Sequence, residues 1–394
     1  MGQDAALIFN HHFISFLVPG MIYCQRVKQR LFSRRRMRRS DSQFASRILA
    51  VLLVCFAAPY LAFSQSQPPD PSDEQTASVP AGDSASDETP AMFPHFESGR
   101  YWLSGQANVV FQWHPAFNSP YQGPNSMTPQ SQSATTHIVT LYTGLEITHT
   151  TEILVDVEDA TGGGVGNALG LGGITDLDDV RTVQGIQLST APYLARMILH
   201  QIIPLSSDRI PAERGPMELA TSLPGRRIEF RFGKFDLADF FDNNSYGSDS
   251  HLQFLNWTVV NNGAWDYAAD TRGYTYAAMV EYDDHKWAVR FAEALMPKIA
   301  NGIHLDADLA RARSENVEFE LHHTVIPHRE GVLRVLGYSN QANMGSYRVA
   351  IANFLGGLTP TPDITAHPFQ TTNKYGFGIN VEQPLNDWLG VFGR

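Results

Sequence analysis

The stretch that decides the fold is Arg227-Ile228-Glu229-Phe230-Arg231-Phe232-Gly233, in which charged and apolar side chains alternate without a break. Successive side chains of a β-strand point to opposite faces, so the three apolar residues share one face and the three charged residues share the other. An α-helix would mix the two kinds around its circumference. The stretch therefore predicts a strand with one apolar face and one charged face.

The same period of two recurs through residues 99–394, in segments separated by clusters of Gly, Asn, Asp and Pro. Repeated strands of this kind predict an all-β, antiparallel fold. The predicted strands are 100–113, 136–147, 151–157, 191–203, 227–233, 272–282, 286–292, 315–322, 331–339, 374–383 and 388–393.

Two architectures fit alternating strands. A soluble sandwich turns its apolar face to a core, whereas a transmembrane barrel turns it to lipid and its charged face to the lumen. Long strands and aromatic residues near strand ends favour the antiparallel transmembrane β-barrel. The aromatic residues expected at the lipid boundary are Tyr101, Trp102, Trp113, Tyr274, Tyr276, Tyr282 and Trp287.

The lengths of the connections also favour a barrel of the outer-membrane type. We expect tight turns at Asp283-Asp284 and at Pro327-His328-Arg329, and long loops at 236–270, 297–314 and 343–372. Short turns on one rim and long loops on the other are typical of outer-membrane barrels.

Residues 1–64 are predicted to be an N-terminal extension with a cleaved export signal. A basic block, Arg34 to Arg39, precedes an apolar run at 48–62, and small residues before Gln65 suit cleavage there. The basic block lies so far from residue 1 that we expect translation to start at Met37; an uncleaved anchor is the alternative. Residues 65–98, rich in Pro, Ser and acidic residues, are expected to be disordered. The barrel would then occupy 99–394, in a Gram-negative-type outer membrane.

Composition excludes several functions. The chain of 394 residues has 29 Lys and Arg against 40 Asp and Glu. Nine basic and two acidic residues lie in 1–64, which leaves 20 basic and 38 acidic residues in 65–394, so a nucleic-acid partner is not expected. Both cysteines, Cys24 and Cys55, lie in the part expected to be removed. No cofactor is predicted. No metal is predicted either, because His322 and His323 point to opposite faces of a strand and His328 is not strand-spaced with them.

Residues 231–273 carry a family resemblance. Arg-Phe-Gly-Lys-Phe-Asp-Leu-Ala-Asp-Phe-Phe-Asp-Asn-Asn begins at residue 231, and Asn-Gly-Ala-Trp-Asp-Tyr-Ala-Ala-Asp-Thr-Arg-Gly begins at 262. The chain from 99 to 394 resembles the carbohydrate-selective porin family (OprB-type). The resemblance implies a single-chain barrel of about 16 strands that passes sugars passively. Since this sequence offers ten or eleven strands and stops in a strand-like segment at Arg394, we expect a C-terminally truncated form.

The resemblance also implies partners and roles: outer-membrane lipid, small sugars as permeants, a monomer or homo-oligomer, and no enzymatic activity. We find no Gly-x-Ser-x-Gly motif for a nucleophile. A general or non-sugar porin, an outer-membrane enzyme and a secreted soluble β-protein that binds polysaccharide remain as alternatives. The Gly-rich stretch from 162 to 173, followed by Asp176, Asp178 and Asp179, is expected to be a flexible extracellular loop.

Two sets of residues are predicted to contact the permeant. The loop 236–270 would fold into the pore and offer carboxylates, amides and indoles to sugar; its alternative is a surface loop with local turns. Charged residues on the polar strand faces would line the lumen; their alternative is salt bridging that stiffens the wall. The loop set is Asp236, Asp239, Asp242, Asn243, Trp257, Trp265 and Asp266, and the wall set is Glu229, Arg231, Lys234, Arg290, Glu318, Glu320 and Arg334.

Overall fold

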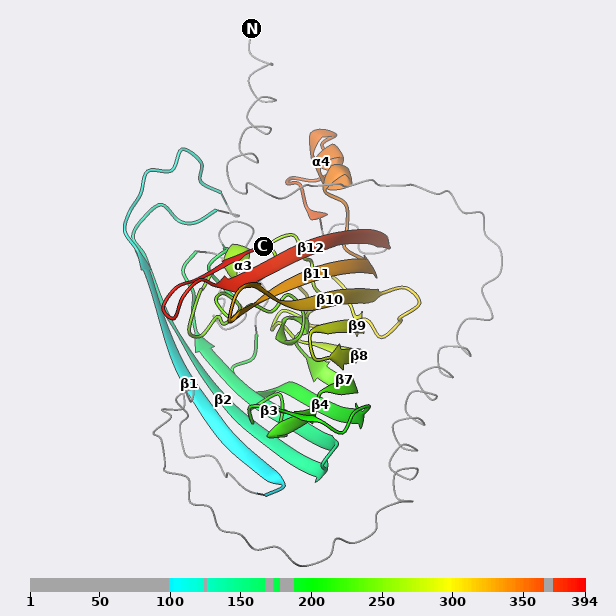
Figure 1. The fold of residues 1–394 in the computed structure, drawn as a ribbon. Helices are drawn as coiled ribbons and strands as arrows, with labels where there is room; N and C mark the ends of the chain where they lie inside the picture. Colours follow the sequence, from blue (N-terminus) through cyan, green and yellow to red (C-terminus); the bar gives the residue numbers. More distant parts are fainter. Residues whose placement is uncertain (1–98, 124–125, 167–172, 178–187, 365–370) are drawn as a thin grey trace, which may run out of the picture. The chain divides into compact units, whose positions relative to one another are not determined.

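The structure is a computed structural model that describes residues 99–123, 126–166, 173–177, 188–364 and 371–394. The proposed N-terminal segments 1–64 and 65–98 lie outside these residues. Eleven strands form one antiparallel sheet, which confirms the predicted all-β class (Figure 1). Its strands are β1 (Tyr101–His114), β2 (Gln132–Thr148), β3 (Thr151–Gly162), β4 (Tyr193–Pro204), β7 (Arg226–Phe235), β8 (Thr275–Asp284), β9 (Trp287–Leu295), β10 (Arg313–Ile326), β11 (Arg329–Ala342), β12 (Thr372–Pro384) and β13 (Gly390–Gly393).

The sheet is a simple meander in which each strand pairs with the next one along the chain. All eleven predicted strands are present, most of them one to several residues longer than predicted. Within the described residues β1 pairs only with β2, and β13 only with β12, so the sheet has two free edges and does not close. A closed transmembrane barrel therefore stays a prediction.

The connections mostly alternate in length, as expected. Residues 149–150, 285–286 and 327–328 make short turns at one rim, while the connections 115–131, 236–274, 296–312 and 343–371 are long and begin and end at the other rim. The exception is the β4–β7 connection, 205–225, which is long although it begins and ends at the short-turn rim. Two details of the prediction were wrong: Asp283 and Asp284 belong to β8, so the turn is His285-Lys286, and Arg329 belongs to β11. His285 and His328 have φ of 44° and 62°, so each turn has one residue in the left-handed region.

Smaller elements lie in the connections. The β4–β7 connection, at the short-turn rim, contains a hairpin that the sequence did not predict, made of β5 (Arg209–Pro211) and β6 (Ser222–Pro224). The long loops contain the 3-10 helix η3 (Leu237–Asp239), α3 (Trp257–Val260) and α4 (Tyr347–Leu355). In the part of the chain that the structure describes, no helix is both long and apolar enough to cross a membrane.

The two faces of the sheet differ in chemistry, because charged and amide side chains are buried on one and large apolar side chains are exposed on the other. Charged and amide side chains such as Glu229, Glu318 and Asn380 are at most 2% exposed. Their strand neighbours on the other face, such as Phe232 and Phe319, are more than 40% exposed. We call these faces the inner and outer face. Further exposed apolar side chains of the outer face are Val109, Phe111, Val139, Leu141, Val157, Phe291, Val317, Val335, Phe377, Ile379 and Val381.

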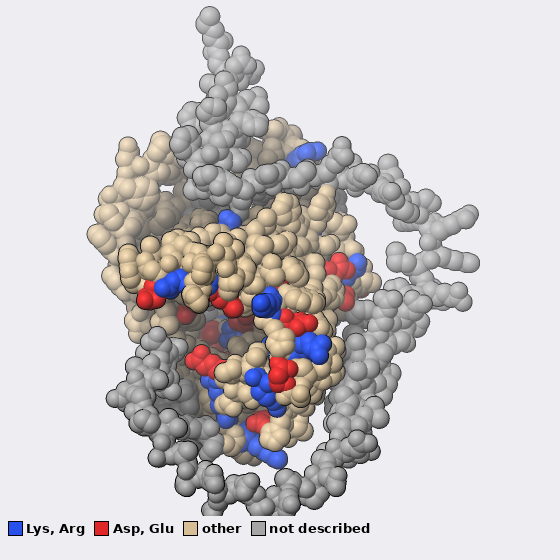
Figure 2. Space-filling model, in the orientation of Figure 1, with Lys and Arg blue, Asp and Glu red and all other residues tan. Residues whose placement is uncertain are grey.

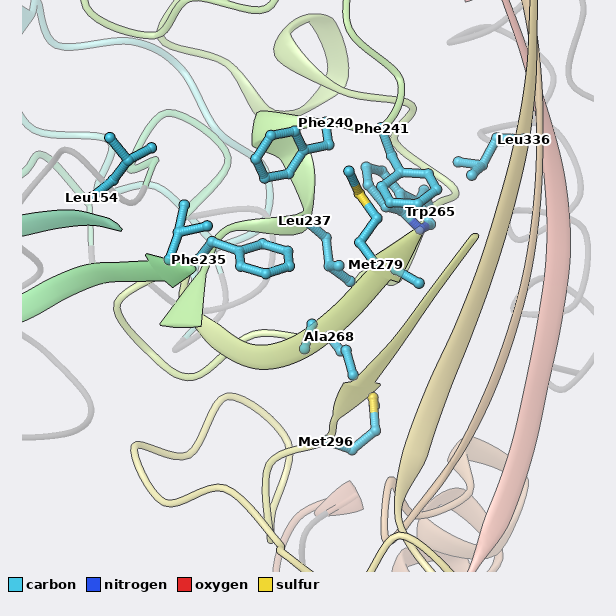
Figure 3. Close-up of a cluster of buried hydrophobic side chains, with 14 of the residues drawn as sticks. Leu154, Phe235, Leu237, Phe240, Phe241, Trp265, Ala268, Met279, Met296 and Leu336 are labelled. Atoms are coloured by element: carbon cyan, nitrogen blue, oxygen red, sulfur yellow. The ribbon is translucent and has the colours of Figure 1, made fainter. Parts of the chain in front are cut away.

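The apolar core lies between the inner face and the β7–β8 connection, which folds back over that face (Figure 3). Phe235, Leu237, Phe241 and Trp265 come from the end of β7 and from this loop, and they pack in one cluster with strand residues such as Met279. Each large side chain removed from water here stabilises the fold by about 1.5–3 kcal/mol. The loop is therefore an integral part of the packed interior.

Candidate functional site in the loop-covered interior

Cross-strand ion pairs run along the inner face of β7 to β12. The guanidinium of Arg290 lies 2.8 Å from Glu281, 2.7 Å from Glu318 and 3.0 Å from Glu320. The guanidinium of Arg334 lies 2.8 Å from Glu320 and 3.0 Å from Glu382. Strand register creates these contacts, because Arg290 is directly opposite both Glu281 and Glu318. We call this group the ion-pair belt; it comprises Arg227, Glu229, Arg231, Glu281, Arg290, Glu318, Glu320, Arg334 and Glu382.

All predicted wall residues except Lys234 belong to the ion-pair belt. Their side chains share the inner face, as the alternation indicated, and they are nearly fully buried. Arg231, for example, contacts Glu229 and lies 3.5 Å from Glu281. Each of these residues contacts a residue of opposite charge, so their contacts are those of the alternative, in which salt bridges stiffen the wall. Glu318 and Glu320 also bind the same guanidinium, that of Arg290.

Asp242 anchors the loop to the last strands. Its backbone N–H donates to Glu318 Oε2 at 2.7 Å, and its carboxylate accepts from the N–H of Asn262 and from Asn380 Nδ2. Arg394 Nε lies 3.0 Å from Asp242 Oδ2. Burial raises the pKa of Asp242 above its ordinary value, while the Arg394 guanidinium and the hydrogen bonds lower it. The backbone and side chain of this one residue thus tie the loop to β10, β12 and the residue after β13.

A second set of contacts fixes the far end of the loop. Trp265 Nε1 donates to Asn316 Oδ1 at 3.0 Å, and the Tyr338 hydroxyl donates to the Ala264 carbonyl at 2.6 Å. Asp266 lies 3.0 Å from Lys374 in a half-exposed pair. Trp265 is 5% exposed and packs within the apolar cluster. It is therefore not placed to stack on a sugar, contrary to the role expected from the sequence.

The other predicted loop residues mostly shape the loop itself. The Asp236 carboxylate accepts from the Ala238 N–H and caps the short helix η3, and Asn243 Nδ2 donates to the Asp239 carbonyl. Asp239 binds Arg196 through two hydrogen bonds, of 2.7 and 2.6 Å. Local turns, the alternative reading, thus describe Asp236 and Asn243, whereas Asp239 connects the loop to β4.

Trp257 differs from Trp265 because it is only partly buried. Its Nε1 donates to the Asp176 carbonyl at 3.0 Å, and its ring lies 6.1 Å from that of Tyr267. Of the two predicted indoles, Trp257 is the one with ring surface left for a ligand.

Sequence reasoning missed a cluster of tyrosines and cations at the long-loop end of the inner face. The guanidinium of Arg272 lies 3.6 Å from the ring centre of Tyr193, and Lys234 Nζ lies 5.4 Å from that of Tyr274. The hydroxyls of both tyrosines donate to the Glu158 carboxylate. Arg272, Tyr193 and Lys234 are partly exposed. We call Glu158, Tyr193, Lys234, Arg272 and Tyr274 the tyrosine–cation cluster.

The structure corrects part of the predicted aromatic boundary with lipid. Tyr101, Trp113 and Tyr276 are exposed on the outer face, as expected, but Trp102 and Tyr274 are buried on the inner face. The parity of the strand shows why: Trp102 is in phase with Ser104, whereas Tyr101 is in phase with Leu103. Proximity to a strand end alone does not decide which face an aromatic residue takes.

Figure 2 shows one side of the molecule with a hollow in its middle. Red and blue side chains gather in and around this hollow, whereas much of the remaining described surface in this view is tan. The distribution agrees with the burial pattern, which places charge on the inner face and apolar atoms outside.

The structure also reveals a His-centred group that the sequence did not suggest. Among the described residues, Glu152, His200 and Glu218 place ligand atoms within 4.8 Å of one another. The histidines considered in the sequence are elsewhere: His322 contacts Glu320 and Glu330, each at 2.8 Å. Glu152 and Glu218 are 66 positions apart and His200 stands between two ordinary strand residues, so no local motif marks them.

Comparison with known proteins finds no matching family model, no matching curated protein and no matching solved structure.

Proposed function

We propose that this chain forms the wall of an outer-membrane β-barrel and acts as a porin for small polar solutes, sugars in particular. The observation that carries the proposal is the reversal of the two faces. Polar and charged side chains are buried on the inner face, while a broad band of large apolar side chains is exposed on the outer face. Monomeric soluble proteins rarely expose contiguous apolar patches larger than a few hundred Å².

Lipid is the environment that such an outer face fits. Outer-membrane barrels alternate apolar residues toward lipid and polar residues toward the lumen, with short turns on one rim and long loops on the other. In the proposed barrel of about 16 strands, further strands would pair with the free edges of β1 and β13, because an unpaired backbone group in hydrocarbon costs several kcal/mol. The secreted soluble alternative would leave the outer face in water.

The folded-in β7–β8 loop supports a narrowed pore. It covers the ion-pair belt of β7 to β12 and is joined to β4 through Asp239 and Arg196, so it would narrow the path left for a solute. Loop and wall together would limit the size of the solute. A passive pore also needs weak binding, so that the solute leaves again.

The tyrosine–cation cluster supports sugar as the permeant. Sugars present hydroxyls to charged groups and apolar C–H faces to aromatic rings, and Tyr193 and Arg272 offer both kinds of contact with part of their surface exposed. A few hydrogen bonds, each worth about 0.5–1.5 kcal/mol net, with one ring contact give millimolar affinity, or about 4 kcal/mol. A general porin would lack this preference.

The test is single-channel current in planar bilayers, with and without glucose or maltose. We expect an open channel that sugar blocks at millimolar concentration. Tyr193→Ala should weaken the block several-fold, while Tyr276→Ala, which removes an exposed tyrosine from the outer face near the same rim, should leave it unchanged. An open channel with no sugar block would favour the general porin, and no channel at all in lipid would contradict the porin proposal.

A further inference from the structure

His200 is fully buried on the inner face of β4, between carboxylates from three different segments. Its Nδ1 lies 2.8 Å from Glu152 Oε1 on β3 and 3.7 Å from Glu218 Oε2 in the β5–β6 hairpin. Its Nε2 lies 2.9 Å from Glu229 Oε2 on β7. One ring nitrogen therefore faces two carboxylates, and the other is held by a third.

This arrangement has the form of a metal site with its supporting hydrogen bond. Metal-binding histidines commonly donate their second ring N–H to a carboxylate, which fixes the tautomer and the ring orientation. Glu229 is placed for that role, and it leaves Nδ1 available beside Glu152 and Glu218. One imidazole nitrogen and two carboxylate oxygens are ligands that Zn²⁺ and related divalent metals accept, with a further position open for water.

The negative charge of the carboxylates around His200 also favours a bound cation. Within the described residues, no Lys or Arg nitrogen lies within 4.0 Å of the Glu152 carboxylate, although Glu152 is 5% exposed. The nearest guanidinium nitrogen to Glu218, that of Arg231, is 4.0 Å away and is also close to Glu229. Buried carboxylates are ordinarily paired or bound to metal. The ion-pair belt meets this need elsewhere on the wall with guanidiniums, whereas the partners of the Glu152 carboxylate are His200 and the Leu219 N–H.

Packing of the β5–β6 hairpin, independent of the ion pairs, holds Glu218 beside His200. Its neighbour Leu219 is 1% exposed, and the Leu219 N–H donates to Glu152 Oε2 at 3.0 Å. Leu219 sits on Gly144 of β2, where a Cβ atom would come within 2.8 Å of it. Glu218 is therefore held next to His200 by a buried anchor as well as by charge.

We propose that Glu152, His200 and Glu218 bind one divalent transition-metal ion of the zinc class, which holds the β5–β6 hairpin against the inner face. The ion would be bound by residues of two strands and the hairpin, so it would join elements far apart in the sequence. This site does not depend on the porin proposal, because it needs only the contacts of the folded chain.

Isothermal titration of the folded full chain with Zn²⁺, with Co²⁺ absorption as a second reading, tests the site. We expect one ion per chain, and at least a tenfold loss of affinity in Glu218→Gln and in His200→Gln. Glu229→Gln removes the carboxylate beside His200 Nε2, which also pairs with Arg227 and Arg231, and should weaken binding about 10–100-fold without removing a ligand. His149→Gln, whose side chain is 96% exposed, is the matched control and should bind as the wild type does.

Limited proteolysis of residues 209–224 tests the consequence for the hairpin. Zn²⁺ should slow cleavage there several-fold in the wild type and in His149→Gln, but not in Glu218→Gln. If His200→Gln does not fold, Glu218→Gln still decides the question, because this residue lies in the hairpin outside the sheet. Absence of one-to-one binding, or equal affinity in wild type and Glu218→Gln, would overturn the proposal.

Discussion

The Oδ2 atom of Asp242, early in the β7–β8 loop, lies 3.0 Å from Nε of Arg394, 152 positions further along the chain. The same guanidinium donates to the Asp242 carbonyl at 2.9 Å and to the Ser248 hydroxyl at 2.6 Å. This contact joins the inward loop to the end of the sheet. The position of the loop therefore depends on a residue at the far end of the sheet as well as on β7 and β8.

The first prediction concerns this contact. Asp242→Ala removes the buried partner of Arg394 and should lower the free energy of unfolding by about 3–5 kcal/mol, as is typical when one member of a buried pair is removed. Asp266→Ala, which breaks the half-exposed pair with Lys374, should cost about 0–1 kcal/mol. Urea unfolding of both variants provides the comparison. Equal stabilities would show that Asp242 does not anchor the loop.

The second prediction concerns Arg290, which three carboxylates of the ion-pair belt share. Arg290→Met leaves Glu281, Glu318 and Glu320 without that guanidinium and should cost about 3–5 kcal/mol. Arg290→Lys should recover only part of this, because an ammonium lacks the planar fork that reaches several oxygens at once. Arg311→Met, at an exposed arginine, is the control and should leave the stability almost unchanged. An unchanged stability in Arg290→Met would count against a structural belt.

Trp265 gives the third prediction, which separates stability from permeation. Trp265→Phe keeps an aromatic ring in the cluster but leaves Asn316 Oδ1 without its donor, so it should cost about 1–3 kcal/mol. Because Trp265 is buried, sugar block of the channel should stay as in the wild type. Thermal unfolding and bilayer recording of the same sample check both expectations. Lost sugar block in a correctly folded variant would restore Trp265 as a ligand-binding residue.

The sequence was sufficient for the sheet because alternation is a local signal. In 227–233 every second residue is charged, and the structure buries those charges and leaves Phe232 exposed. The same signal placed the members of the ion-pair belt on one face. It could not show which charge meets which, because that depends on the register between neighbouring strands.

The hairpin and the His200 group were missed for physical reasons. β5 and β6 have three residues each and contain Pro211 and Pro224, so no period can be read from them. His200 lies between Leu199 and Gln201, and its partners come from distant segments. The burial of Trp265 likewise depends on how the loop folds over the sheet, which composition alone does not determine.

The central claim is that the outer face contacts lipid, and one pair of variants tests it most directly. Phe319 lies near the middle of β10 on the outer face, whereas Val325, 80% exposed, lies beside the β10–β11 turn. Arginine facing lipid costs about 2–4 kcal/mol at mid-membrane and about 0–1 kcal/mol near the interface. The measurement is the free energy of folding into lipid vesicles. The account predicts a clear loss for Phe319→Arg and almost none for Val325→Arg; equal folding of both variants, or folding of both in buffer without lipid or detergent, would contradict it.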